Sequence, residues 1–150
     1  MGRRYTTHGT GAVGTDKTIS TMVSATTIRP ALYELIAGCE ATPADQATDF
    51  KLNRFTAAGT AGSSFTPIAH DPADPAALAS SGSGVFTTEP TYTASSFLLQ
   101  FSMNQRVTFR WVTIPEMGLL APATAANGIG FKSASATGTA THEGTLIWME

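Results

Sequence analysis

Apolar and polar residues alternate along two neighbouring stretches in the second half of the chain. In residues 97–103 and 107–111 every second position is apolar, and these positions are Phe97, Leu99, Phe101, Met103, Val107, Phe109 and Trp111. A period of two is typical of a strand with one buried face. Because only residues 104–106 separate the two stretches, the pattern predicts an antiparallel pair. Its buried residues are expected to be Leu99, Phe101, Phe109 and Trp111.

Other stretches with apolar residues predict further strands. They cover residues 31–36, 50–56, 129–134 and 139–148. In the last of these, Gly144, Leu146 and Trp148 share one face. Turn residues separate about eight or nine strands at a spacing of 8–12 residues, which is typical of a β-sandwich or barrel. The sequence therefore predicts an all-β, antiparallel sandwich.

One short helix is predicted between these strands, over residues 74–79. Asp74 suits the N-cap and Pro75 suits the first helical position. Residues 80–84 follow it and are rich in Ser and Gly, so we expect them to form a loop.

Composition narrows the class of protein. The chain has 150 residues, which is the size of one domain, and 42% of them are hydrophobic. Charged residues make up 13%, against about a quarter in ordinary domains, and the net charge is -2. Such a hydroxyl-rich surface suits a protein packed against copies or partners, although Thr also simply suits exposed strand positions. The charge balance excludes a nucleic-acid partner, and no apolar run is long enough for a membrane span.

Few residues in the chain suggest catalysis or metal binding. His8, His70 and His142 have no second ligand at metal-binding spacing, so we expect them to be exposed polar residues. Cys39 is the single cysteine, which excludes a disulfide within one chain, and we expect a small buried thiol. Gly9–Gly14 matches a G-x-G-x-x-G pattern but lacks the strand before it and the helix after it. No enzyme activity, metal or cofactor is therefore expected.

Aromatic residues leave one alternative open. Trp111, Trp148, Phe109 and Tyr92 could form a sugar-binding platform, or they could be core or interface anchors. The alternation places Trp111 on the same face as Phe109, which favours the core.

Six short strings stand in order along the chain and carry a family resemblance. They are RPALYELIAG from Arg29, ATPAD from Ala41, RFTAAGT from Arg54, DPADPAA from Asp71, NQRVTFRW from Asn104 and PATAANGIG from Pro122. This succession resembles small virion structural proteins of tailed bacteriophages, and the chain is similar in size and composition to head decoration, or cement, proteins. The resemblance extends over about residues 29–148. It implies a jelly-roll β-sandwich, assembled as a homotrimer and seated on the capsid lattice, with no catalytic or cofactor residue.

The expected function is accordingly structural. The resemblance implies a capsid decoration protein, made in the bacterial cytoplasm and located on the virion surface, whose partners are itself and a major capsid protein. No small-molecule substrate is expected. Two alternatives stay open: a tail or receptor-binding module that binds host glycans, and an enzyme of a β-sandwich class such as a cupin-like or esterase-like domain.

Residues 1–14 lie outside the resemblance and are rich in Gly and Thr, with no apolar periodicity. They are predicted to form an N-terminal arm, ahead of a single β-sandwich domain at 15–150. We expect this arm to reach a neighbouring subunit or the capsid floor, with Arg3 and Arg4 meeting acidic groups and Tyr5 as the anchor. The alternative is that it docks on its own domain.

Overall fold

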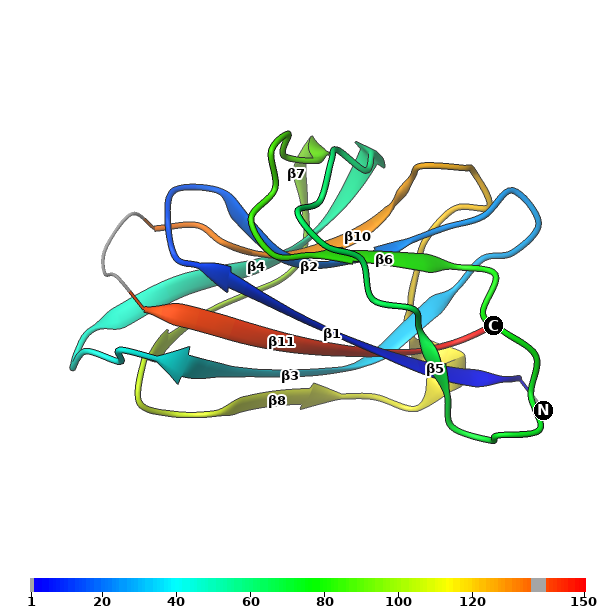
Figure 1. The fold of residues 1–150 in the computed structure, drawn as a ribbon, viewed down its shortest axis with the longest axis horizontal. Helices are drawn as coiled ribbons and strands as arrows, with labels where there is room; N and C mark the ends of the chain where they lie inside the picture. The colour runs from blue at the N-terminus through cyan, green and yellow to red at the C-terminus, as the bar shows by residue number, and fades with distance from the viewer. Residues whose placement is uncertain (1, 136–139) are drawn as a thin grey trace.

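The chain forms two antiparallel sheets packed face to face (Figure 1). The computed structural model describes residues 2–135 and 140–150. The first sheet has the order β5-β1-β11-β3-β8, with β9 also paired to β3, and the second has the order β6-β2-β10-β4-β7. The strands of the first sheet are β5 (Ile68–Ala69), β1 (Arg4–Ala12), β11 (Thr141–Met149), β3 (Ala31–Ala41), β8 (Phe109–Val112) and β9 (Leu119–Leu120). Those of the second are β6 (Ser80–Ser83), β2 (Lys17–Val23), β10 (Gly128–Ser133), β4 (Ala47–Ala57) and β7 (Thr91–Asn104).

Eight of the strands follow a jelly-roll path. Strands β1-β11-β3-β8 face strands β2-β10-β4-β7, and the chain passes from one sheet to the other at every connection between these strands except that from β4 to β7. This wrapping of eight antiparallel strands into two sheets is the jelly-roll architecture. The predicted all-β sandwich of jelly-roll type is therefore confirmed.

The core lies between the inward faces of the two sheets. Along β11, positions 142, 144, 146 and 148 are buried and the positions between them are partly exposed, so the predicted inward face of this strand is confirmed. The largest fully buried side chains include Trp148, Phe50, Phe131, Leu35 and Leu52. Each such Leu or Phe stabilises the fold by roughly 1.5–3 kcal/mol through removal of apolar surface from water.

Strands β7 and β8 do not pair with each other, so the predicted hairpin is wrong. Strand β7 pairs with β4 in the second sheet, and β8 pairs with β3 in the first. Gln105, between them, is buried, and its side chain accepts from the Ala44 N–H (2.9 Å) and donates to Thr48 Oγ1 (3.0 Å). The connection thus crosses between the sheets. The four residues expected to be buried do face the core, but they are only half-buried because both strands lie at sheet borders.

Residues 4–12, expected as part of an arm, instead form β1 between β11 and β5. The structure thus agrees with the alternative prediction, in which residues 1–14 dock on their own domain. The glycines have a packing role here: a Cβ at Gly9 would lie 2.6 Å from the Ile19 carbonyl oxygen and 2.6 Å from Ser20 Cβ. They let β1 approach β2 closely. Just before β1, Arg3 and Glu150 form two backbone hydrogen bonds. The Arg3 N–H donates to the Glu150 carbonyl (2.9 Å), and the Glu150 N–H donates to the Arg3 carbonyl (2.8 Å).

The helix predicted over residues 74–79 is absent, and residues 80–83 form β6 rather than a loop. The Leu78 and Ala79 N–H groups donate to the Glu150 carboxylate at 3.0 and 2.9 Å, so they are bound to a distant residue instead of to helical carbonyls. Asp71 accepts from the Ala73 N–H (2.9 Å) in a turn. The one helical element of the described residues is a 3-10 turn, η1, at Pro115–Met117.

Candidate functional site

The three predicted interface residues are placed differently by the structure. Tyr5 is 1% exposed, packs against Trp148 with ring centroids 6.3 Å apart, and donates its hydroxyl to the Pro75 carbonyl (3.0 Å). Burial raises the Tyr5 pKa, helped by the negative charge of Glu150, so the phenol stays neutral. It belongs to its own core and is not available to anchor a partner. Arg3 and Arg4 are exposed.

Arg3 and Arg4 line a polar hollow at this corner of the molecule. Its volume is about 320 Å³, and the other lining residues are Gly2, His70, Asp71 and Asp74. Arg3 Nε lies 3.6 Å from Asp74 Oδ1, and its side chain is 56% exposed. An ion pair this exposed is worth about 0–1 kcal/mol. Arg4 makes no ion pair with another residue of the described ranges 2–135 and 140–150.

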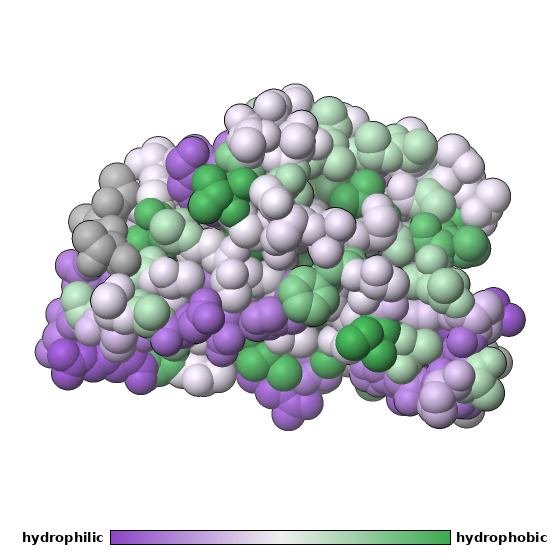
Figure 2. All heavy atoms as spheres, in the orientation of Figure 1, coloured by the Kyte–Doolittle hydropathy of each residue, from purple (hydrophilic) through white to green (hydrophobic). Residues whose placement is uncertain are grey.

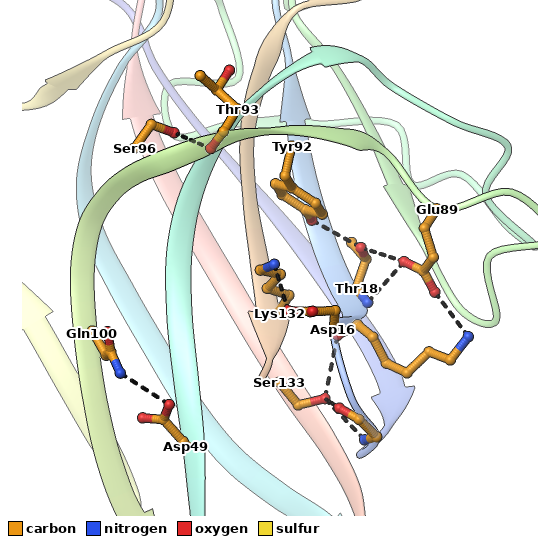
Figure 3. A network of polar contacts seen from close by, with 12 residues as sticks. Asp16, Thr18, Asp49, Glu89, Tyr92, Thr93, Ser96, Gln100, Lys132 and Ser133 are labelled. Carbon is orange, nitrogen blue, oxygen red and sulfur yellow. Dashed lines mark hydrogen bonds and ion pairs between the residues drawn. The ribbon is translucent and has the colours of Figure 1, made fainter. Parts of the chain in front are cut away.

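A network of polar side chains covers part of the outer face of the second sheet (Figure 3). Glu89 Oε2 accepts from Thr18, from its N–H at 3.1 Å and its hydroxyl at 2.6 Å. The Thr18 hydroxyl lies 2.8 Å from the Tyr92 hydroxyl. Lys132 Nζ lies 4.4 Å above the Tyr92 ring and donates to Asp16 Oδ1 at 2.7 Å. We call this set, with Lys17, the Tyr92 network.

The charges of the Tyr92 network balance one another, and each charged group is paired within the network. Its charges are Asp16, Glu89, Lys17 and Lys132, two of each sign, and Lys17 Nζ lies 3.4 Å from Glu89 Oε1. The Lys132 side chain is 8% exposed, and it is satisfied by Asp16 and the aromatic ring. Burial raises the pKa of Tyr92 far above its usual range, so the phenol cannot act as a base near neutral pH. The arrangement therefore suits attachment of the segment around Glu89 to the sheet rather than proton transfer.

Sequence reasoning missed this network. Thr18 is 71 residues from Glu89 and 74 from Tyr92. No local pattern signals such a distant set of contacts. One available signal was Gly130 in a strand interior, because a Cβ there would collide with the Tyr92 hydroxyl.

A second, smaller hollow of about 170 Å³ lies beside the network. Residues 12–14, 17–18, 84–86 and Glu89 line it. Val13, Val85 and Phe86 make much of this lining apolar. Pockets for small-molecule ligands are usually about 300–1,000 Å³, so this hollow suits a single side chain better than a substrate.

His142 and Cys39 depart from expectation, whereas His70 is exposed and His8 is partly exposed. His142, expected to be exposed, is fully buried: Nδ1 lies 3.1 Å from the Gly38 carbonyl and the ring meets Phe50 edge-on at 4.8 Å. Its Nε2 has no hydrogen-bond partner among the described residues, and burial lowers the His142 pKa. Cys39, expected to be buried, is half-exposed near the end of β3, beyond the part paired with β8. Partial burial raises the pKa of its thiol, which disfavours the thiolate.

Within the described ranges, no three His, Cys, Asp or Glu side chains come together to hold a metal ion. The four aromatic residues considered for a sugar platform lie in different parts of the fold. Trp148 is fully buried, Phe109 and Trp111 pack against the core, and Tyr92 belongs to the network outside the second sheet. They do not form one common platform.

Large exposed apolar side chains gather along one border of the first sheet. Both β8 and β9 pair with β3, so residues 112–120 follow that border. Val112, Ile114, Met117 and Leu120 are 52%, 59%, 71% and 41% exposed. We call these four residues the apolar border. On the face shown in Figure 2, most of the surface is of intermediate hydropathy, with apolar side chains in separate patches and hydrophilic ones gathered mainly along its lower edge.

No protein-family model matches this chain, and comparisons with curated proteins and with solved structures give no match. Among the described residues, no helix has the length and apolar character needed to span a membrane.

Proposed function

We propose that this protein is a structural virion protein, a head decoration or cement protein that stabilises a bacteriophage head through oligomeric contacts with the major capsid protein. The observation that carries the proposal is the apolar border. Single exposed apolar side chains are common on monomers, whereas four large ones following one sheet border favour a contact surface.

Composition and fold support the same reading. With 13% charged residues, the surface has little of the charge that keeps free proteins apart in solution. Jelly rolls serve in viral capsids, but also in lectins and cupins, so the fold is compatible with the proposal without selecting it. The capsid role is preferred among these because six short strings of the sequence resemble small phage structural proteins.

Stabilisation would follow from mass action. A protein that binds only the assembled lattice adds its binding free energy to the stability of the lattice. A homotrimer closed by cyclic symmetry would bind through three equivalent surfaces, and the second and third contacts would benefit from a high effective concentration. Each subunit would contribute the apolar border as the desolvated centre, with Arg3 and Arg4 as basic groups at a rim.

The glycan-binding tail module stays the alternative. It would require an aromatic platform on the surface, and the four aromatic residues considered for one lie apart. No described surface therefore favours it over the capsid role.

Copy number in the virion tests the proposal. Phage particles whose genome encodes this chain would be purified, separated into heads and tails, and analysed by quantitative mass spectrometry. A cement protein is expected in the head fraction at a copy number comparable to that of the major capsid protein. Presence in tails alone at a few copies, or absence from particles, would contradict the proposal.

Binding to heads tests the surface. Met117→Lys is expected to lower the affinity for heads that lack the protein, because it places a charge in the apolar border. Val85→Lys is the matched control, since Val85 is 76% exposed and lies away from that border. Equal binding of both variants would remove the apolar border from the proposal.

A further inference from the structure

Strand β7 has a long unpaired edge. It runs over 14 residues and pairs only with β4, so its other side ends the second sheet. From Leu99 to Asn104 the register with β4 is regular, and its shifts lie on the N-terminal side of Leu99. The unpaired side of this segment therefore presents a row of backbone N–H and C=O groups in strand geometry.

The opposite side of the sandwich is built differently. There β5 lies outside β1, and β6 lies outside β2, so each longer strand is covered by a short one. The other strands at sheet borders have two residues (β5, β9) or four (β6, β8). Among the described strands, only β7 combines a free edge with a length that supports an extended ladder.

Two usual protections of an edge strand, charge and proline, are missing from β7, and its register irregularities all lie before Leu99. Residues 91–104 contain no charged residue and no proline, which are common devices against pairing with another chain. The neighbouring charges belong to β4 and are engaged there. Asp49 accepts from Gln100 Nε2 at 3.0 Å (Figure 3) and from Ser102 Oγ at 3.2 Å, and Lys51 lies 4.7 Å above the Phe97 ring.

We propose that β7 pairs antiparallel with β7 of a second copy of this chain, joining the two second sheets into one continuous sheet across a two-fold axis. An antiparallel self-pair satisfies the free N–H and C=O groups of both strands at once. The second copy is the occupant because an uncharged strand meets no repulsion from itself, and because its β7 offers a free edge of equal length. Leu99 and Phe101, half-buried in β7, would become covered.

This contact is separate from the proposed function and does not depend on it. A two-fold contact through β7 differs from a cyclic trimer contact, and a chain that has both could link neighbouring trimers. The strand pairing can be tested on the purified protein alone.

Sedimentation equilibrium of the full chain gives the first test. The wild type is expected to reach twice the chain mass of 15.6 kDa, or a multiple of it, as concentration rises through the micromolar range. Gln100→Lys with Ser102→Lys places charges on exposed positions of the strand and is expected to weaken this association at least tenfold. Thr87→Lys with Thr88→Lys adds the same charge at exposed positions outside β7 and should leave it unchanged. Circular dichroism and thermal melting check that all variants fold.

Cross-linking gives the second test and reads out the register. In a Cys39→Ser background, single cysteines are placed in turn at residues 98–103. A two-fold antiparallel pair brings only the position at the axis, or its nearest neighbours, opposite its own copy, so disulfides are expected at one or two positions. A chain that stays monomeric, association untouched by the β7 lysines, or no cross-link at any position would overturn the proposal.

Discussion

Phe101 and Phe109 stack with their ring centroids 3.7 Å apart although they belong to opposite sheets. Phe101 also stacks on Phe50, whose centroid is 5.7 Å away, so the contact continues into the core. The connection after β7 leaves one sheet and enters the other, and this stack fastens the two strands that it joins.

The stack predicts a measurable coupling between its two residues. Phe101→Ala and Phe109→Ala are each expected to lower the free energy of unfolding by about 2–4 kcal/mol, somewhat less than for fully buried rings. In a double-mutant cycle their coupling should be about 0.5–1.5 kcal/mol. Urea denaturation measures all four species. Phe55→Ala combined with Phe109→Ala is the control, and it should be additive because Phe55 packs on Tyr92 instead. Additive losses for the stacked pair would refute the coupling.

His142 predicts a pH-dependent stability. Its pKa is lowered in the folded protein by burial, from the ordinary value of 6.5, so the unfolded chain binds the proton more readily. The corresponding stability is fully present above about pH 6.5 and is lost as the pH falls through that value toward the folded pKa. The slope from this one residue is at most about 1.4 kcal/mol per pH unit.

Unfolding measured between pH 8 and pH 5 checks this expectation. His142→Phe should lose the slope in this window, whereas His70→Gln, at an exposed position, should keep it. An identical slope in the wild type and in His142→Phe would show that another group is responsible.

Gly9 predicts a steric limit between β1 and β2. Gly9→Ala would place a Cβ 2.6 Å from the Ile19 carbonyl oxygen, and backbone atoms cannot move aside easily. We expect a loss of about 1–3 kcal/mol in the free energy of unfolding, as for other overpacked positions. Thr10→Ala, at the next position on the strand, is the control and should cost less. If Gly9→Ala were as stable as the wild type, the sheets would not be in close contact there.

The Tyr92 network predicts that Thr18 is important for stability. Thr18→Val keeps the shape of the side chain but removes the hydroxyl that bridges Glu89 and Tyr92. The expected cost is about 1–3 kcal/mol, because partly buried polar groups lose a partner. Thr15→Val, at an exposed position, serves as the control in thermal or urea unfolding. Comparable stability of the two variants would mean that the network does not hold the segment around Glu89.

The sandwich could be predicted from the sequence because alternation reports a buried face directly. Leu146 and Trp148 face the core as expected, and Phe101 and Phe109 do so too. Alternation does not reveal which other strand a given strand pairs with, and the prediction of a hairpin between β7 and β8 failed for that reason. Strand partners depend on contacts that are distant in sequence.

Residues 1–14 show a second limit of sequence reasoning. Glycine indicates either a flexible segment or a close approach of two chains, and only the surroundings distinguish these. Gly9 faces Ile19 and Ser20 across the sandwich, which no local pattern reveals. The positions of Cys39 and His142 failed similarly, because burial depends on where a strand lies relative to its neighbours.

The mutual hydrogen bonds of Arg3 and Glu150 place the two ends of the described chain at one corner (Figure 1). A peptide fused to either end would emerge from the same spot on the molecule. A short linker could also join the ends and new ends could be opened in an exposed turn such as residues 42–45, because permutation is best tolerated where the original ends already meet. The fold thus offers a ready scaffold for displaying two foreign sequences side by side.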